Sequence, residues 1–333
     1  MAVRVGINGF GRIGRCTLAA IIEEQRSDIE VVAINATGPL DTNAHLLKYD
    51  SVHGRFKGEI TLADGRMDVG QGPIRMMSTY DPNELDWGDV DIVMECSGKF
   101  NSKEASAVHL DRGAKRVLIS APGKNADKTV VYGVNQHALT EDDLIVSNAS
   151  CTTNCLAPIA KVLNDAIGME KGFMTTIHAY TGDQPTLDRR HSDLYRARAA
   201  GMSMIPTSTG AAQAVGLVLP ELAGRLSGSA IRVPTPNVSA VDLTFISSQP
   251  TNADAVNEAV QRAASQEMKG IIEYGDEPTV SIDYNHNTHS SNFAALQTSV
   301  MGDNLVRVLA WYDNEWGFSC RMADTAVAMG KLI

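Results

Sequence analysis

The stretch that decides the fold lies near the start of the chain, where residues 3–14 read VRVGINGFGRIG. The β-branched run 3–8 predicts a strand, and apolar residues at helical spacing over 12–25 predict a helix. Between them, Gly9, Gly11 and Gly14 have the spacing Gly-x-Gly-x-x-Gly. Glycines at such a turn let the main chain approach a pyrophosphate at the positive helix N-terminus. This stretch predicts a Rossmann-type dinucleotide-binding domain.

The remainder of the first half continues the alternation of strands and helices. Further strands are expected at 29–35, 90–96, 115–120, 129–134 and 144–148. Short β-branched runs separated by helical patterns are typical of a doubly wound, mostly parallel sheet with both faces covered.

The second half, from about Ser150, has a different pattern. Longer alternating runs occur at 172–180, 229–234, 238–247, 291–300 and 304–312, with a helix expected over 252–268. This pattern predicts an α+β domain with a mostly antiparallel sheet, so the chain as a whole is expected to be an α/β protein of two domains.

Composition limits the classes of partner and the compartment. The 333 residues include 39 acidic and 29 basic side chains, for a formal net charge of −10. This charge argues against a nucleic acid or an anionic membrane as the main partner. Five cysteines without a short-spaced pairing framework favour a reducing compartment. With no leader pattern and no long apolar run, a cytoplasmic location is expected.

Cys151 is the candidate nucleophile. It lies between the strand 144–148 and an apolar helical pattern, so a helix N-terminus would stabilise its thiolate. Cys155 lies one helical turn further on, and a metal site is the rival interpretation of this pair. Because no second Cys/His cluster with ligand spacing occurs, no metal is expected.

The residues alone leave the other site candidates open. His178, in the strand 172–180, is either a base for Cys151 or a core histidine. The exposed arginines Arg189, Arg190, Arg196 and Arg198 either bind an anion or form a solvated loop. Arg232 lies in an apolar strand, which indicates a bound carboxylate or phosphate, or else an internal ion pair.

A thiolate and a nicotinamide in one protein together suggest aldehyde oxidation. Addition of the sulfur gives a thiohemiacetal, hydride leaves to the cofactor, and an acyl thioester remains for a second nucleophile. A base near the sulfur is needed to take the proton from the hemiacetal oxygen.

At this point the sequence closely resembles the phosphorylating glyceraldehyde-3-phosphate dehydrogenase family. The resemblance is carried along the whole chain by VGINGFGRIGR at 5–15, HLLKYDSVHGRF at 45–56, SNASCTTNCLAP at 147–158, the stretch 178–184, PTSTGAA at 206–212, RVPTPNVSAVDL at 232–243 and WYDNEWGFS at 311–319. It implies a Rossmann domain of residues 1–149 and 317–333, a catalytic domain of residues 150–316, and a homotetramer in which 182–204 reaches towards a neighbour's cofactor.

The resemblance also assigns roles to residues. It implies that Cys151 and His178 are catalytic. It implies cofactor binding by Gly9, Gly11, Arg12, Ile13, Gly14, Ser120 and Asn314, and binding of the substrate phosphate and inorganic phosphate by Ser150, Thr152, Thr181, Arg196, Thr209, Gly210 and Arg232.

Three departures from the family pattern concern the cofactor. Ala36 stands where NAD-selective members carry an Asp that binds the ribose, Arg189 and Arg190 replace a Leu-Pro pair, and Tyr80 replaces an Arg. Losing a carboxylate and gaining guanidinium groups both favour a 2′-phosphate. The expectation is therefore use of NAD or NADP, with Ala36, Tyr80 and Arg190 at the adenosine end. The alternative is that Asn35 or main-chain groups hold the ribose and keep NAD as the cofactor.

The expected reaction converts D-glyceraldehyde 3-phosphate, inorganic phosphate and NAD(P)+ to 1,3-bisphosphoglycerate and NAD(P)H, a step of glycolysis and gluconeogenesis. One alternative is erythrose-4-phosphate dehydrogenase, which ends its thioester with water. The intact phosphate motifs at 181–183 and 207–210 argue against it. An alternative of another class is a nucleic-acid-binding role of the Rossmann domain, against which the net charge weighs.

Overall fold

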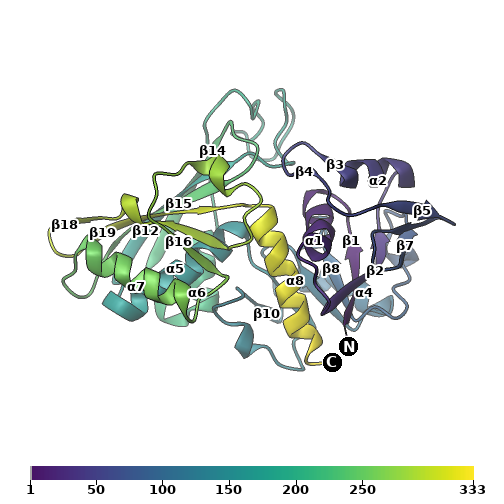
Figure 1. Cartoon of the computed structure of the whole chain (residues 1–333), viewed down its shortest axis with the longest axis horizontal. Coiled ribbons are helices and arrows are strands. Elements are labelled where there is room, and N and C mark those ends of the chain that lie inside the picture. Colours follow the sequence, from purple (N-terminus) through teal and green to yellow (C-terminus); the bar gives the residue numbers. More distant parts are fainter. Residues whose placement is uncertain (1) are drawn as a thin grey trace. The chain divides into compact units, whose positions relative to one another are not determined.

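The computed structural model describes residues 2–333 and divides the chain into two compact units. The first unit comprises Met1–Ser150 and Ser319–Ile333, and the second comprises Cys151–Phe318. Each unit is built around its own large sheet (Figure 1).

The sheet of the first unit has nine strands in the order β10-β11-β9-β8-β1-β2-β7-β6-β5. The strands are β1 (Val3–Asn8), β2 (Ile29–Asn35), β5 (Thr61–Ala63), β6 (Arg66–Asp68), β7 (Pro73–Met77), β8 (Ile92–Glu95), β9 (Arg116–Ile119), β10 (Lys128–Thr129) and β11 (Ile145–Ser147). Pairing is parallel from β10 to β7 and antiparallel from β7 to β5. Because β2 and β8 flank β1 on opposite sides, the strand order reverses beside β1, which is where doubly wound sheets bind ligands.

Helices and one small ribbon complete the first unit. They are α1 (Arg12–Glu23), α2 (Leu40–Lys48), α3 (Lys103–Ser106), α4 (Val108–Asp111) and the ribbon of β3 (Tyr49–Asp50) with β4 (Gly54–Arg55). The C-terminal segment 319–333 contributes most of α8 (Trp316–Gly330). The Thr325 hydroxyl donates to Asn148 Oδ1 at 2.7 Å, and Arg26 pairs with Asp324 at 2.6 Å, so this segment is tied to the first unit.

The sheet of the second unit is mixed. Its order is β13-β14-β12-β15-β19-β17-β16, and β18 pairs with β19. The strands are β12 (Lys171–Ala179), β13 (Ile205–Thr207), β14 (Leu226–Val233), β15 (Ser239–Ile246), β16 (Ile272–Gly275), β17 (Ser291–Ala294), β18 (Ser299–Met301) and β19 (Leu305–Tyr312). The pairs β12–β14 and β16–β17 are parallel and the others antiparallel.

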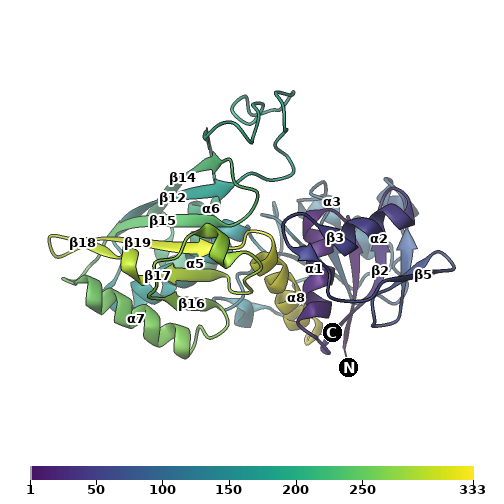
Figure 2. The same cartoon turned by 45° about the horizontal axis from the view of Figure 1, so that its top comes forward.

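Three longer helices belong to the second unit, and Figure 2 shows α7 on the lower side of its sheet. They are α5 (Cys151–Ile167), α6 (Ala211–Val218) and α7 (Ala253–Ser265). Short 3-10 helices occur in both units at Pro82–Glu84, Gln136–Ala138, Pro220–Leu222, Ser281–Tyr284 and Ala295–Gln297. The long connection between β12 and β13 projects from the end of the sheet (Figure 2).

Two predicted strands are wrong in extent. The strand expected at 129–134 ends at Thr129, because the Asn135 side chain accepts from Val131 N at 2.9 Å and Val134 N bonds to Val131 O, which bends the chain into turns. Val130 and Val131 are fully buried, and this is why the run looks like a strand. The strand expected at 291–300 is divided into β17 and β18 by the 3-10 turn Ala295–Gln297.

Within residues 2–333, every helix is too short or too polar to cross a membrane.

Candidate functional site

The three glycines of the first turn each have a different physical role. Gly9 has a φ of +94°, and a Cβ added there would lie 2.6 Å from the main chain of Ser97. A Cβ on Gly14 would lie 2.2 Å from Gly9 O, so this glycine lets α1 pack on the turn. A Cβ on Gly11 would meet nothing within 4 Å. Gly11 thus leaves open space at the start of α1, as expected where a phosphate approaches the main chain.

The Arg12 side chain binds the strand β3 and does not face open space. Its guanidinium forms two hydrogen bonds with the carboxylate of Asp50, which also accepts from Val52 N and His53 N. Burial raises the pKa of Asp50, but these hydrogen bonds outweigh it and bring the pKa to about 2. Because the guanidinium is bound to Asp50, an anion at this turn would be bound by main-chain N–H groups of α1.

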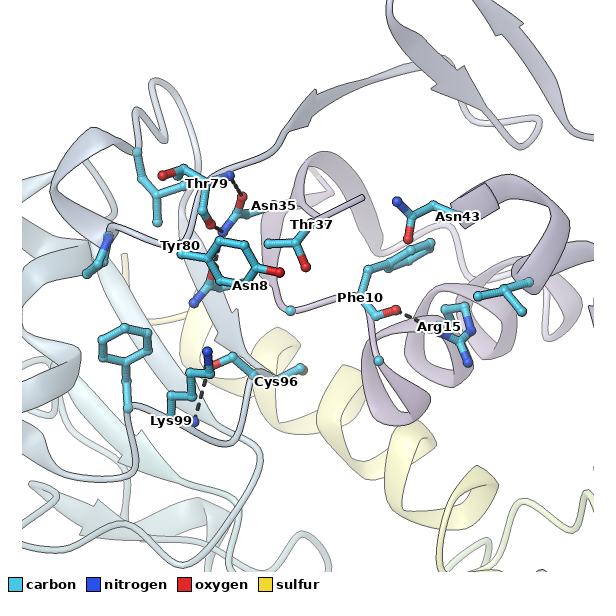
Figure 3. Close-up of a pocket in the computed structure, with 17 residues that line it drawn as sticks. Asn8, Phe10, Arg15, Asn35, Thr37, Asn43, Thr79, Tyr80, Cys96 and Lys99 are labelled. Carbon is cyan, nitrogen blue, oxygen red and sulfur yellow. Dashed lines mark hydrogen bonds between the residues drawn. The ribbon is translucent and has the colours of Figure 1, made fainter. Parts of the chain in front are cut away.

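A cavity of about 360 Å³ lies at the carboxyl ends of β1, β2 and β8 (Figure 3). Gly9, Gly11 and Tyr80 line it, as the sequence predicts for cofactor contacts. Arg12, Ile13, Gly14, Ala36 and Ser120 are not among its lining residues. Arg15 and Lys99 are its basic residues, and none of the described residues that line it is acidic.

The part of the cavity predicted to bind adenosine has no carboxylate at the end of β2. Ala36 is buried and bonds through its main chain to Met77 O at 2.9 Å. The side chain of Asn35 donates to Asn8 Oδ1 at 2.8 Å and to Thr79 O at 3.1 Å. Both of its N–H donors are therefore used within the protein, which weakens the alternative that Asn35 holds the ribose.

Tyr80 and Ser120 lie at opposite sides of this sheet edge. Tyr80 is 79% exposed, and Lys99 Nζ lies 5.2 Å from the centre of its ring. Ser120 follows β9 and donates its main-chain N–H to Glu95 O at 3.0 Å. Lys99 and Thr37 line the cavity but were missed from the sequence, although both follow the carboxyl end of a parallel strand, the usual position for ligand contacts.

In the second unit, Cys151 is the first residue of α5 and faces His178 at the end of β12. Cys151 Sγ lies 3.5 Å from His178 Nε2. His178 Nδ1 lies 2.6 Å from Ala179 O, which can only accept, and 3.1 Å from Arg232 Nη1, which can only donate. The shorter contact assigns the proton to Nδ1, and Arg232 Nη1 has Ala179 O and Thr181 Oγ1 as its acceptors. The unprotonated Nε2 is then an acceptor directed at the sulfur. The structure thus joins the two residues that the sequence alone could not pair.

Burial favours the neutral form of both members of this pair. Burial raises the pKa of the Cys151 thiol, although the charge of Arg232 and hydrogen bonds with Thr152 act in the opposite direction. Burial, followed by the charge of Arg232, lowers the pKa of His178 to about 3. Burial thus opposes the thiolate that the helix N-terminus is expected to stabilise. The geometry provides a thiol beside a base.

Arg232 is the main cationic group beside this pair. It lies opposite His178 in the parallel pairing of β14 with β12. Its Nη1 donates to Ala179 O at 3.0 Å and to Thr181 Oγ1 at 3.2 Å, both uncharged acceptors. Among the described residues its buried Nε has no hydrogen-bond partner. A half-buried guanidinium with uncharged partners favours a bound anion over the internal ion pair.

Other predicted anion-binding residues are differently placed. Arg196 pairs with Asp183 at 3.1 Å, and its Nε donates to Thr207 Oγ1 at 3.0 Å, so its charge is partly compensated. The Thr181 hydroxyl donates to the same Asp183. Thr209 and Gly210 stand at the start of α6, where Thr209 Oγ1 accepts from Ala211 N. The half-buried Ser150 comes just before α5.

Thr152, which the sequence predicts as a donor to phosphate, contacts a tyrosine in the structure. Its buried hydroxyl lies 2.8 Å from the hydroxyl of Tyr312, which also lies 2.9 Å from Thr176 Oγ1. The Tyr312 ring meets His178 edge-on at 5.9 Å. Tyr312 supports both sides of the pair and was missed, because a tyrosine in an alternating strand carries no signal of its own.

The other predicted site residues are Asn314 and two exposed arginines. Asn314 is buried, and its Oδ1 accepts from Ser239 Oγ at 2.7 Å. Arg189 and Arg190 are exposed and, with Gln184, line a hollow of about 250 Å³ in the loop after β12. Cys16, Cys155 and Cys320 are buried and Cys96 is partly buried, and within residues 2–333 none of the five cysteines forms a disulfide.

A glycine turn on a parallel sheet in one unit and a thiol–imidazole pair in the other define a dinucleotide-binding protein with a cysteine site. Comparison with known families agrees. The NAD binding domain of glyceraldehyde 3-phosphate dehydrogenase matches residues 3–103, and the C-terminal domain matches residues 150–314. Over the full length of both chains, the sequence is 66% identical to glyceraldehyde-3-phosphate dehydrogenase of Xanthobacter flavus and 64% identical to that of Cereibacter sphaeroides. It is 53% identical to the Geobacillus stearothermophilus protein over 98% of each chain. The chain belongs to the glyceraldehyde-3-phosphate dehydrogenase family.

Proposed function

We propose that this protein oxidises D-glyceraldehyde 3-phosphate to 1,3-bisphosphoglycerate, with inorganic phosphate and NAD+ or NADP+. The observation that carries the proposal is the 3.5 Å approach of Cys151 Sγ to the unprotonated His178 Nε2, beside Arg232. A nucleophile, a base and a cation for a phosphate then lie together.

The side chains divide the reaction into two stages. His178 Nε2 takes the thiol proton as Cys151 Sγ adds to the aldehyde carbon, and the proton passes to the new oxygen to give a thiohemiacetal. A nicotinamide dinucleotide, which the turn at Gly9 and Gly11 would hold, would supply the acceptor for the hydride of that carbon. His178 Nε2 takes the hydroxyl proton again, which leaves an acyl thioester on Cys151. Inorganic phosphate then attacks the thioester carbon, and the sulfur leaves and recovers its proton.

The phosphate groups are assigned to the cationic and hydroxyl-rich part of the second unit. Arg232, whose buried Nε has no hydrogen-bond partner among the described residues, binds one phosphate together with Thr181 and Arg196. Ser150, Thr209 and Gly210 complete the sites for the two phosphates. Thr152 acts indirectly by positioning Tyr312, since its hydroxyl is buried against that residue.

The cofactor contacts are assigned to residues of the first unit and to Asn314 of the second. Gly9, Gly11 and the main chain of Arg12 and Ile13 receive the pyrophosphate, while Gly14 permits the close packing of α1. Tyr80 and Lys99 flank the adenosine, and Ala36 and Ser120 shape the sheet edge beneath. Asn314 orients the nicotinamide carboxamide, with its own Oδ1 fixed by Ser239.

Use of NADP as well as NAD is part of the proposal. The adenosine cavity has no acidic lining residue in the described chain, Ala36 offers no carboxylate, and Lys99 adds a positive charge. A 2′-phosphate would therefore meet no repulsion there. Arg190 of a neighbouring subunit is a further candidate contact.

The assembly is proposed to be a cytoplasmic homotetramer. Large apolar side chains are exposed on the loop after β12, with Leu187, Leu194, Tyr195, Met202 and Met204 between 63% and 81% exposed. Such a patch is typical of an interface between subunits.

One kinetic experiment tests the reaction. Initial rates are measured with glyceraldehyde 3-phosphate, with and without inorganic phosphate, and with NAD+ and NADP+ in parallel. Turnover that needs phosphate supports the proposal, and turnover unaffected by its omission would favour hydrolysis of the thioester. A kcat/KM for NAD+ about a hundredfold above that for NADP+, roughly 2.7 kcal/mol, would contradict dual use.

A pair of cysteine variants tests the nucleophile. Cys151→Ser should lose nearly all turnover while it still binds dinucleotide, because the hydroxyl is a far weaker nucleophile. Cys155→Ser is the matched control, since Cys155 lies one turn along the same helix, is fully buried and faces Ser291 Oγ at 3.4 Å. Full turnover by Cys151→Ser would disprove the assignment.

A further inference from the structure

A second histidine–acid pair lies in the first unit, away from Cys151 and His178. Glu95, the last residue of β8, and His109 of α4 are both fully buried, and Glu95 Oε2 lies 2.9 Å from His109 Nε2. Glu95 also accepts from Asn8 Nδ2 at 2.5 Å, from Ser97 N at 2.7 Å and from the Ser97 hydroxyl. Four donors occupy the acceptor positions of this carboxylate.

The direction of each hydrogen bond in this cluster is fixed. Trp87 Nε1, which can only donate, lies 3.2 Å from His109 Nδ1. His109 Nδ1 is therefore the acceptor, Nε2 carries the proton, and the neutral ring donates to Glu95. The carboxyl group of Glu95 is thus held by four hydrogen bonds from three side chains and one main-chain N–H.

From Glu95 a chain of amides leads to the wall of the dinucleotide cavity. Asn8 gives its N–H to Glu95, so its Oδ1 is turned to accept from Asn35 Nδ2 at 2.8 Å. Asn35 Oδ1 in turn accepts from Thr79 N at 3.1 Å. Asn8, Asn35 and Thr79 line the cavity (Figure 3), and so does Ser97, which Glu95 holds directly. Glu95 and His109 do not line it.

We propose that Glu95 and His109 are positioning residues, which hold two sides of the dinucleotide cavity from beneath. One side is Ser97 after β8, and the other is the segment at Thr79, reached through Asn8 and Asn35. A buried carboxylate is stable only while all its donors stay in place, so this cluster keeps the cavity wall rigid before the ligand arrives. The inference rests on the proposed binding of a nicotinamide dinucleotide in this cavity.

Glu95→Gln tests the cluster with little change of shape. Its oxygen can still accept from Ser97, but its new NH2 group faces the N–H donors of Asn8 and His109. Asn8 must then turn, which opposes its NH2 to that of Asn35. The cavity wall is then no longer held in the conformation that binds the ligand, so Kd for NAD+ and NADP+ should rise roughly tenfold or more. At saturating dinucleotide, kcat and the KM for the aldehyde should stay within about twofold of wild type.

Asp143→Asn is the matched control. Asp143 is a buried carboxylate of the same unit that accepts from Thr140 N at 2.7 Å and Thr140 Oγ1 at 3.0 Å, and it does not line the cavity. It should lose stability without weakening dinucleotide binding. Equal Kd values for Glu95→Gln and wild type would overturn this inference and leave the proposed function intact. A wild-type protein that bound neither dinucleotide would instead contradict the proposed function.

A second pair of variants serves if Glu95→Gln does not fold. His109→Gln can still donate to Glu95 and accept from Trp87, whereas His109→Leu can do neither. Kd is measured well below the unfolding temperature, so a purely structural loss leaves it unchanged. The inference expects weak dinucleotide binding by His109→Leu and near-normal binding by His109→Gln, and equal, wild-type Kd values in both would overturn it.

Discussion

Arg232 sets the charge balance around His178. Its guanidinium lies 3.1 Å from His178 Nδ1 and, after burial, is the main cause that lowers the pKa of His178 to about 3. Arg232 also acts to lower the pKa of Cys151, where a lower pKa favours the charged thiolate. The same residue thus keeps the base unprotonated at neutral pH and provides the cation for a phosphate.

Arg232→Gln should therefore move the pH profile. Removing the guanidinium raises the pKa of His178 from about 3 towards its ordinary value of about 6.5, so the acidic limb of log kcat/KM should shift to higher pH. Activity should also fall at every pH, because phosphate binding is weakened. The profile is measured with saturating dinucleotide, and an acidic limb at the wild-type position would contradict this assignment.

Asp50 provides a stability prediction at the same scale. Its pKa of about 2 lies below the unfolded value near 3.9, so its contribution is fully present above about pH 4 and is lost as the pH falls through 2. Allowing for solvent screening, Asp50→Asn should lower the free energy of unfolding by about 1 kcal/mol at pH 7 and by little near pH 2. Denaturant unfolding at the two pH values measures the difference, and an equal loss at both would contradict it.

At the scale of elements, α1 shows how a helix is attached to its strand. Its N-cap, Gly11, makes no side-chain capping bond, and Gly14 brings the first turn against Gly9 O. The helix start is therefore held by close packing and remains available to a ligand.

Two glycine variants separate these roles. Gly14→Ala should lower the melting temperature, because its Cβ would lie 2.2 Å from Gly9 O, a main-chain atom that cannot move alone. Gly11→Ala has no neighbour within 4 Å, so it should fold normally and bind dinucleotide more weakly. Thermal unfolding and dinucleotide titration measure the two effects. Normal dinucleotide affinity in Gly11→Ala would show that no ligand approaches this turn.

The sequence predicted the bounds of some strands correctly and those of others wrongly. The strands 3–8 and 29–35 are confirmed at both ends, because each is a buried run bounded by turn residues. The run 129–134 also contains several apolar residues, but the Asn135 side chain binds the main-chain N–H of Val131. Burial alone therefore does not make a strand, since the hydrogen-bond partner must also be an adjacent strand.

At the scale of the whole molecule, the proposed tetramer makes the loop after β12 an interface. Met204→Asp should weaken association, because Met204 is 76% exposed and lies with Leu194 and Tyr195 around one hollow. A buried charge would oppose the contact. Sedimentation should give four times 35.7 kDa for wild type and smaller species for the variant. Leu62→Asp, on the exposed strand β5, is the control, and an unchanged mass for Met204→Asp would contradict this interface.

The sequence by itself determined the features that depend on neighbouring residues. The glycine spacing after 3–8 predicted the strand–turn–helix of the first unit, and Cys151 was expected at a helix start, where the structure has it. These features are local, because the turn, the helix and its cap are set within about one turn of chain.

Only the tertiary structure decided which distant residues share a site. Pairing of β12 with β14 places Arg232 beside His178, 54 positions apart in the chain, and folding of α5 against them brings Cys151 to 3.5 Å. Burial then opposes the expected charge of the thiol. Likewise, Glu95 meets Asn8 only because β8 pairs with β1. Register between strands far apart in sequence is set by the packing of the whole sheet, so no short stretch of sequence determines it.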